Sequence, residues 1–168
     1  MTKEEFQKQV IPVGDKMYRI AYRLLGNSEA AKDVLQELFL KLWEKRNELH
    51  NIVNIDAFAC TILKNKCLDK LRAQKDTVDI DILKAMGNNP ETAFDQNESV
   101  AEIKRLMQNL PDKQRLIMQM RDIDCCTFEE IALIVDTSVN NVRVQLCLAR
   151  KSIKQELMKV YNYGIPRN

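Results

Sequence analysis

The sequence predicts an all-α protein in which two small helical domains are joined by an acidic linker. Apolar residues recur at three- and four-residue steps along most of the 168 residues, as they do in amphipathic helices. The chain has four Gly and four Pro, too few for a fold rich in strands and turns. Residues 76–97 are acidic and contain GNNP, which interrupts a helix. We therefore expect domains at residues 1–75 and 98–168, with a linker at 76–97.

Composition argues against several classes of protein. No apolar run reaches the length of a membrane span, and residues 1–10 lack the apolar core of a signal peptide, so we expect a cytoplasmic protein. His50 is the one histidine, there is no glycine-rich phosphate loop, and the five cysteines have no zinc-site spacing. We expect no enzymatic activity, no cofactor and no metal.

The most informative stretch, residues 127–157, predicts two helices with a tight turn between them. Thr127 and Glu130 have the spacing of a capping box at the start of the first helix. Asp136 suits the turn that ends it, and Ser138 suits the N-cap of the second. One face of the second helix is apolar and carries Val142, Leu146, Ala149 and Ile153. This is the layout of a helix-turn-helix domain, whose second helix enters the DNA major groove.

Polar side chains near the start of this second helix suit base edges: Asn140, Asn141, Arg143 and Gln145. Arg pairs bidentately with guanine, and Asn or Gln with adenine. Basic residues further along suit phosphates: Arg150, Lys151 and Lys154. The alternative is an ordinary helical hairpin with a solvated charged face. Residues 64–75 and 138–168 are each basic, which indicates two contacts with a polyanion unless both are solvated helix faces.

The first half of the chain predicts three helices. The first spans residues 3–25 and is expected to bend near Pro12. The second has Ser28 as its N-cap and runs to about Asn47. The third covers residues 55–75 and carries the first basic patch.

The second of these helices has an apolar stripe wider than one partner helix needs. Phe39, Leu40 and Trp43 lie along it. Aromatic residues flanked by charges are typical of anchors in protein interfaces. Outward-facing anchors and ordinary core packing are both compatible with the pattern.

In the second half, further helices are expected at residues 98–110 and 111–120. The cysteines occupy two kinds of position. Cys60 and Cys67 are seven apart on a helical pattern, where small buried residues are expected. Cys125 and Cys126 lie at a helix junction, where a redox role is the alternative to a structural one.

Taken in order, these blocks resemble a bacterial RNA polymerase sigma factor of the extracytoplasmic-function type. SEAAKDVLQELFLKLWEK, residues 28–45, resembles the polymerase-binding helix of sigma domain 2. ILKNKCLDKLRAQ, residues 62–74, resembles the following helix, which supports promoter opening. Residues 110–157 resemble sigma domain 4. Many regulators share a helix-turn-helix, but the paired blocks at this spacing are specific.

The resemblance implies that the chain binds core RNA polymerase, directs it to specific promoters and helps to open the DNA. Residues 1–75 would be sigma domain 2 and residues 98–168 sigma domain 4. The set implied to bind polymerase is Asp33, Gln36, Glu37, Phe39, Leu40 and Trp43. The set implied to capture the upstream-ten element and its opened strand is Arg46, His50, Asn51, Asn54, Lys64, Lys66, Lys70 and Arg72. The set implied to bind the upstream-thirty-five element is Thr127, Asn140, Asn141, Arg143, Gln145, Arg150, Lys151 and Lys154.

The resemblance also implies three partners: core RNA polymerase, promoter DNA, and an anti-sigma factor, through which alone the chain would contact a membrane. We expect weak binding to promoter DNA alone, because neither domain is strongly charged. The alternative is a stand-alone helix-turn-helix regulator that binds an operator as a dimer, although no long heptad seam is present to form one. The chain departs from the usual family pattern at Phe58, Asp136, Val139, Asn141 and Cys147. Its promoter preference therefore cannot be copied from relatives.

Overall fold

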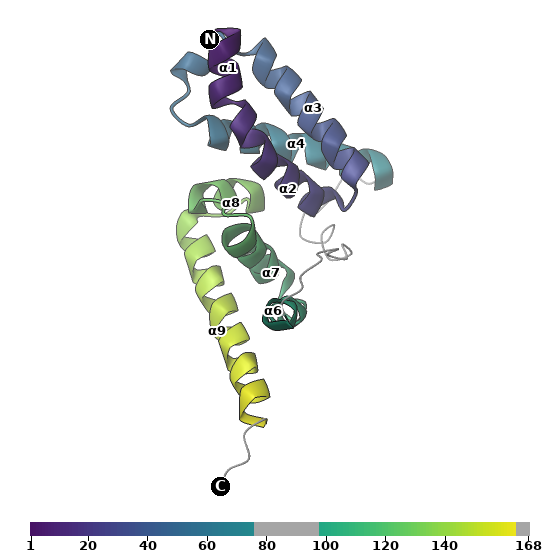
Figure 1. Cartoon of the computed structure of the whole chain (residues 1–168), viewed down its shortest axis with the longest axis vertical. Helices are drawn as coiled ribbons and strands as arrows, with labels where there is room; N and C mark the ends of the chain where they lie inside the picture. The colour runs from purple at the N-terminus through teal and green to yellow at the C-terminus, as the bar shows by residue number, and fades with distance from the viewer. Residues whose placement is uncertain (76–97, 164–168) are drawn as a thin grey trace.

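The computed structural model describes residues 1–75 and 98–163. Within these residues the regular elements are helices, with no strand, as predicted. They form two groups that lie one beyond the other along the longest axis of the molecule (Figure 1). None of the described helices has the length and apolar character of a membrane span. The predicted linker at 76–97 lies outside the described residues.

The N-terminal group consists of α1 (Lys3–Gln9), the short 3-10 helix η1 (Ile11–Val13), α2 (Gly14–Leu25), α3 (Ser28–Glu44), the 3-10 helix η2 (Leu49–Asn51) and α4 (Ile55–Lys75). The bend expected near Pro12 is confirmed, but it divides the predicted helix into α1 and α2, because Pro12 lies in η1. The N-cap of α3 is Asn27 and not Ser28: the Asn27 side chain accepts a hydrogen bond from the Ala30 N–H at 2.9 Å. Both residue types are good caps, so the sequence alone did not distinguish them. The helix ends at Glu44, three residues before the predicted end.

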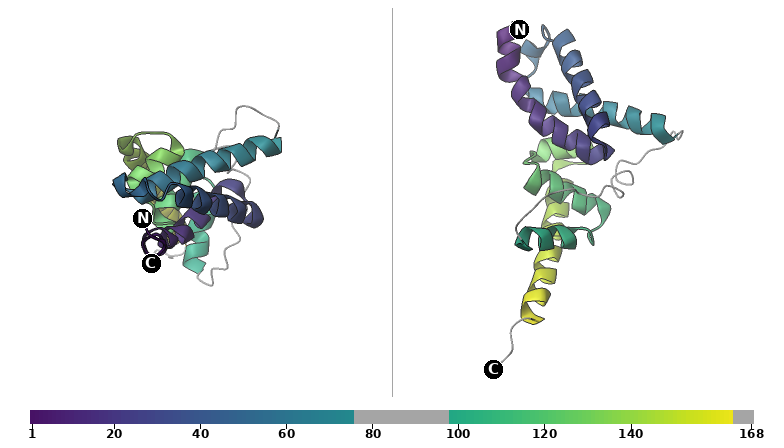
Figure 2. Two further views of the ribbon diagram at one scale, coloured as in Figure 1. Left: turned by 90° about the horizontal axis from the view of Figure 1, so that it is seen from above. Right: turned by 45° about the vertical axis from the view of Figure 1, so that its right-hand side comes forward.

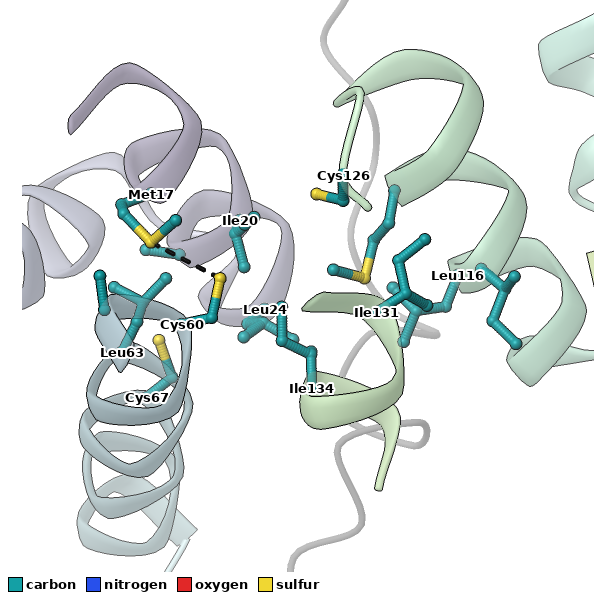
Figure 3. Close-up of a cluster of buried hydrophobic side chains, with 14 of the residues drawn as sticks. Met17, Ile20, Leu24, Cys60, Leu63, Cys67, Leu116, Cys126, Ile131 and Ile134 are labelled. Carbon is teal, nitrogen blue, oxygen red and sulfur yellow. Dashed lines mark hydrogen bonds between the residues drawn. The ribbon is translucent and has the colours of Figure 1, made fainter. Parts of the chain in front are cut away.

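The core of this group lies between α2, α3 and α4, which pack against one another in pairs. Met17, Leu38 and Leu63 are fully buried there. Cys60 and Cys67 on α4 are buried as predicted, with the Cys60 and Met17 sulfur atoms 3.9 Å apart (Figure 3). The three-helix layer leaves the outer faces of α3 and α4 on the surface.

The C-terminal group consists of α6 (Glu98–Met107), α7 (Asp112–Met118), the π-helical turn η3 (Gln119–Ile123), α8 (Phe128–Val135) and α9 (Val139–Tyr163). Both α7 and α8 pack against α9. Ile117, Ile131 and Val142 are fully buried in this core. From its contact with α8, α9 runs away from the N-terminal group (Figures 1 and 2).

The two groups touch through α8, which packs against α4. Their buried apolar side chains belong to one cluster, and Figure 3 shows Leu24 of α2 and Ile134 of α8 close to this contact. The helix that begins the helix-turn-helix is therefore also the helix that joins the two groups.

Candidate nucleic-acid interface

The helix-turn-helix forms through the local interactions that its sequence predicts. The Thr127 hydroxyl accepts a hydrogen bond from the Glu130 N–H at 3.1 Å, and the Glu130 carboxylate accepts one from the Thr127 N–H at 2.8 Å. After α8, Asp136 adopts the left-handed conformation, with φ 55°. The Ser138 hydroxyl then accepts a hydrogen bond from the Asn141 N–H at 3.1 Å and caps α9. The predicted caps and turn are thus confirmed, and Thr127 uses its hydroxyl as a cap.

The predicted base-reading residues of α9 are not equally available. Asn140 and Arg143 are exposed. Gln145 is half-buried and accepts a hydrogen bond from the Gln114 side chain at 3.2 Å. Asn141 is half-buried too, and its Oδ1 is enclosed without a hydrogen-bond partner in the described part of the chain. We therefore retain Asn140 and Arg143 as the freer polar side chains.

An arginine–aromatic stack supports Arg143. Its guanidinium lies over the Phe128 ring, 5.1 Å from the centroid, and the guanidinium of Arg121 lies over the same ring at 4.6 Å. Arg121 also donates a hydrogen bond to the Cys126 carbonyl at 2.7 Å. Such cation–π contacts are worth roughly 0.5–1 kcal/mol each at exposed sites. Sequence spacing gave no sign of this stack, because its members come from η3, α8 and α9.

The expected phosphate-binding residues also differ from one another. Arg150 forms a bidentate ion pair with Asp122, and this hydrogen bonding raises the pKa of Arg150. Lys151 and Lys154 are exposed, and neither has an ion-pair partner within the described residues. Lys151 and Lys154 can therefore meet phosphates directly, whereas Arg150 must first leave Asp122.

The loop between α3 and α4 presents some of its predicted residues and uses others internally. His50 and Asn51 are exposed. The Arg46 guanidinium lies 4.6 Å from the Trp43 ring centroid and donates a hydrogen bond to the Trp43 carbonyl at 3.0 Å. The Asn54 side chain accepts a hydrogen bond at 3.0 Å from a backbone N–H in the first turn of α4. His50 and Asn51 are thus the freer candidates for a base contact, while Arg46 and Asn54 shape the loop.

Two lysines of the predicted DNA set are paired with two acids of the predicted polymerase set. The Lys66 ammonium lies 2.7 Å from the Glu37 carboxylate, and the Lys70 ammonium lies 3.1 Å from the Asp33 carboxylate. These pairs bridge α4 and α3. From the sequence, DNA binding and polymerase binding were assigned to separate surfaces. In the structure these two surfaces are adjacent, because residues of one form ion pairs with residues of the other.

The remaining predicted cations of α4 are engaged as well. Lys64 donates a hydrogen bond to the Leu133 carbonyl of α8 at 3.0 Å, and its ammonium lies 4.0 Å from the Asp136 carboxylate. Arg72 pairs with Asp69 at 3.3 Å on the surface of α4. A cleft of about 510 Å³ runs between α4 and α8, and Lys64 and Val139 both line it. The start of α9 is therefore next to the basic stretch of α4.

The predicted polymerase-binding face of α3 is only partly outward. Leu40 is 59% exposed, and three polar residues beside it are exposed as well: Asp33, Gln36 and Glu37. Phe39 is half-buried against α2, where a side chain at Gly14 would meet its ring. Trp43 is half-buried beneath α1, with its ring edge-on to Phe6 at 5.1 Å. Of the three stripe residues, Leu40 faces outward and the two aromatic residues belong largely to the core.

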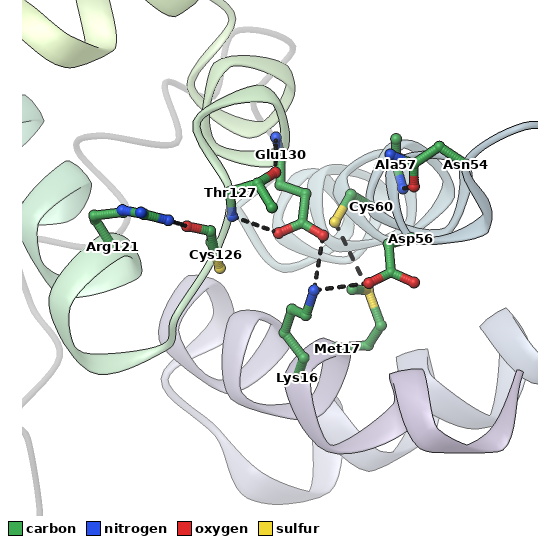
Figure 4. A network of polar contacts seen from close by, with 10 residues as sticks. All are labelled: Lys16, Met17, Asn54, Asp56, Ala57, Cys60, Arg121, Cys126, Thr127 and Glu130. Carbon is green, nitrogen blue, oxygen red and sulfur yellow. Dashed lines mark hydrogen bonds and ion pairs between the residues drawn. The ribbon is translucent and has the colours of Figure 1, made fainter. Parts of the chain in front are cut away.

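Ion pairs to two buried carboxylates, those of Asp124 and Glu130, join the two helical groups, a feature that the sequence did not reveal. The Lys16 ammonium lies 2.8 Å from carboxylate oxygens of both Asp56 and Glu130 (Figure 4). The Arg23 guanidinium makes two hydrogen bonds to Asp124, at 2.7 and 3.1 Å. Burial lowers the pKa of Lys16, but its hydrogen bonds to the two carboxylates outweigh that effect, and the pKa is raised. Because Glu130 is 1% exposed and the Lys16 side chain 21% exposed, the ion pair between these two residues is largely shielded from water.

The cysteines fall into two classes. Burial raises the pKa of Cys67 and Cys126 to about 12, and it raises the pKa of Cys60 as well. Such thiols stay protonated near neutral pH and are poor nucleophiles. Cys125 and Cys147 are exposed. The buried Cys126 is therefore a poor candidate for a redox role. Within the described residues, no group of three His, Cys, Asp or Glu side chains could hold a metal ion.

Comparison with known families matches both halves of the chain. Residues 12–77 match the model of sigma-70 region 2, and residues 101–153 match that of sigma-70 region 4. Together these matches cover most of the chain and include the helix-turn-helix and the α3–α4 layer.

Similar proteins agree with these matches. ECF RNA polymerase sigma factor SigW of Bacillus subtilis is 27% identical over 165 residues, covering 85% of this chain and 83% of the relative. ECF RNA polymerase sigma-E factor of Escherichia coli K12 is 26% identical over 168 residues, covering 92% and 87%. Among solved structures, the sigma factor RpoE in complex with the anti-sigma factor NepR from Bartonella quintana aligns with a TM-score of 0.62 at 21% identity, over 94% of this chain and 98% of that one. CnrH in complex with the cytosolic domain of CnrY aligns with a TM-score of 0.57 at 16% identity, over 94% and 90%.

Proposed function

The chain belongs to the sigma-70 family, as an RNA polymerase sigma factor of the extracytoplasmic-function type, and we propose which of its surfaces performs each step of promoter selection. It binds core RNA polymerase and directs it to specific promoters. Residues 1–75 act as sigma domain 2, which binds polymerase and the upstream-ten element. Residues 98–168 act as sigma domain 4, which reads the upstream-thirty-five element, and residues 76–97 link the two. The polymerase supplies the chemistry, and this chain is not itself an enzyme.

The observation that carries this division is the presence of two different surfaces in one chain. On α9, residues 139–155 contain no carboxylate, and Lys151 and Lys154 are exposed there, as a DNA-binding helix requires. On α3, the exposed Leu40 lies among exposed acidic residues, as a protein-docking face requires. A stand-alone regulator would need the first surface but not the second.

The closeness of the two DNA-reading surfaces in this structure implies that they separate when the chain engages a promoter. The upstream-ten and upstream-thirty-five elements are separated by roughly 25 base pairs, and at about 3.4 Å per base pair this is about 85 Å. Here the start of α9 and the basic stretch of α4 line one cleft. The two reading surfaces must therefore move apart to engage both elements. Residues 76–97 could reach about 75 Å when extended, and the width of the domains adds to that distance.

The same contacts support weak binding to DNA in the absence of polymerase. Lys66 and Lys70 hold carboxylates of their own chain, and Lys64 is hydrogen-bonded to α8. Each would have to exchange that partner for a phosphate, which reduces the gain from binding DNA. Attachment to polymerase would make the two DNA contacts intramolecular and offset the loss.

We also propose that an anti-sigma protein controls this chain by covering the same surfaces. The support is the structural likeness to RpoE, which was solved in complex with the anti-sigma factor NepR. The chain would act in the cytoplasm with the polymerase, and only such a partner would bring it to a membrane.

The test is transcription of fragmented genomic DNA by bacterial core polymerase with and without the chain, followed by sequencing of transcript 5′ ends. We expect new start sites that share two upstream sequence elements at a fixed spacing. Arg143→Ala should lose these starts while keeping its binding to polymerase. Starts that are the same with and without the chain would contradict the proposal. Tight operator binding without polymerase would favour the stand-alone regulator.

A further inference from the structure

The face of α9 that points away from the protein is centred on an aliphatic residue. Val142, Leu146, Ala149 and Ile153 form the buried face. At about 100° per residue, Val144 lies opposite the middle of that face, with Leu148 one turn later and Asn140 one turn earlier. Val144 is 54% exposed and Leu148 46% exposed. We call Asn140, Val144 and Leu148 the outer ridge of α9.

Two of the polar residues chosen as base readers from their chemistry, Arg143 and Gln145, lie beside this ridge. Arg143 and Gln145 are each about 100° from Val144 around the helix, on opposite sides. Their contacts agree with this placement, because Arg143 leans on Phe128 and Gln145 is hydrogen-bonded to Gln114. If α9 entered a major groove with its buried face on the protein, the ridge would face the floor of the groove and the flanking residues its walls.

From this geometry we propose that Val144 and Leu148 read thymine methyl groups in the upstream-thirty-five element, an inference that rests on the proposed function. Thymine is the one base that presents a methyl group in the major groove. An aliphatic side chain gains contact with that methyl. Against the hydrogen-bonding edges of a G·C pair it would instead remove water without replacing its hydrogen bonds. The element should therefore contain thymine, on either strand, where the ridge meets it.

Charge identifies DNA as the occupant of the ridge and argues against a protein with a basic surface. Residues 139–155 carry four basic side chains and no acidic one: Arg143, Arg150, Lys151 and Lys154. Val144 and Leu148 thus form an apolar patch within a positively charged surface, with the exposed Lys151 following on the same face. This suits a polyanion that carries methyl groups in its groove. Asn140 at the start of the ridge adds a side chain that can pair with adenine.

The test replaces single thymines by deoxyuridine, which lacks only the methyl group, in the promoter that the transcription experiment identifies. Binding of the polymerase complex to each duplex is then measured. We expect binding to fall about three- to fivefold at one or two positions, the size of one lost methyl contact. Val144→Ser or Leu148→Ser should abolish the penalty at its own position, so that thymine and deoxyuridine bind equally.

Met158→Ser is the matched control, since Met158 is 55% exposed on the same helix but lies well over two turns beyond Leu148. It should keep the full deoxyuridine penalty.

If no deoxyuridine changes binding while the chain still selects promoters, the methyl inference is wrong and the proposed function stands. If the element contains no thymine, the inference is also wrong. If the polymerase complex selects no promoter at all, the proposed function itself fails. Unchanged thermal unfolding of the serine variants would show that they fold normally.

Discussion

Lys16 of α2 and Glu130 of α8 form an ion pair with an N–O distance of 2.8 Å across the contact between the two helical groups. The same Glu130 carboxylate accepts a hydrogen bond from the Thr127 N–H and so completes the capping box of α8. One side chain therefore stabilises both the start of the helix-turn-helix and its contact with the N-terminal group. The opening that we propose for the promoter-bound chain would break the first interaction and can keep the second.

Glu130→Gln separates these two roles. Glutamine preserves a capping box but removes the charge that faces Lys16. Losing a charge-assisted hydrogen bond costs roughly 1.5 kcal/mol, so the balance between the closed and open arrangements should shift about tenfold toward open. Small-angle X-ray scattering should then report a larger radius of gyration.

The control for that experiment is Glu29→Gln, which neutralises a carboxylate in an exposed pair with Lys32. It should leave the radius unchanged. Equal radii for Glu130→Gln and the wild type would mean that this ion pair does not hold the groups together.

The cysteines offer a second measure of opening. Cys126 is fully buried, and Figure 3 shows its sulfur directed toward the N-terminal group. Burial raises its pKa to about 12, so at pH 8 the thiol stays protonated and unreactive. Iodoacetamide should modify the exposed Cys125 and Cys147 first, as read by mass spectrometry, and should reach Cys126 faster in Glu130→Gln. All five cysteines should react in guanidinium chloride, and early modification of Cys126 in the wild type would contradict the packing.

The two kinds of residue on α3 should respond differently to substitution. Trp43→Ala removes a half-buried ring that contacts Phe6 and Arg46 and should lower the free energy of unfolding by about 2–3 kcal/mol. Leu40→Asp changes an exposed side chain and should alter it by less than about 0.5 kcal/mol. Denaturant unfolding measures both values. If Trp43→Ala left the free energy of unfolding unchanged, Trp43 would be an outward-facing interface residue and not part of the core.

The stack on Phe128 should matter for promoter selection. Phe128→Leu removes the ring on which Arg143 and Arg121 rest, so binding of the polymerase complex to its promoter should weaken about three- to tenfold. Phe128→Tyr keeps an aromatic face and should bind normally. Equal binding by the Leu and Tyr variants would show that the stack does not position Arg143.

Much of the helix-turn-helix could be predicted from the sequence, because its caps and turn depend on residues close together in the chain. Thr127 with Glu130, Asp136 and Ser138 were all assigned correctly on that basis. The buried face of α9 was also correct, since helical spacing determines it. The centre of the outer face was missed, because residues were chosen there for their chemistry and Val144 has no hydrogen-bonding group.

The features that the sequence did not show depend on contacts between distant segments. Trp43 was left open because nothing in its own helix shows that α1 covers it. The partners of Lys66 and Lys70 lie on α3, and those of Lys16 lie on α4 and α8. The sequence shows which charges exist, whereas the packing of helices determines which ones meet. The assignments to DNA and polymerase stay predictions until binding is measured.

The central claim is that this chain acts on RNA polymerase, and the most direct test is gel filtration of the chain with bacterial core polymerase in the absence of DNA. We predict co-elution at near-equal stoichiometry, and its loss in Leu40→Asp, which keeps the fold but places a charge on the exposed face of α3. If a folded chain that is free of inhibitor elutes apart from the polymerase, the account is contradicted. The stand-alone DNA-binding regulator would then be the better description.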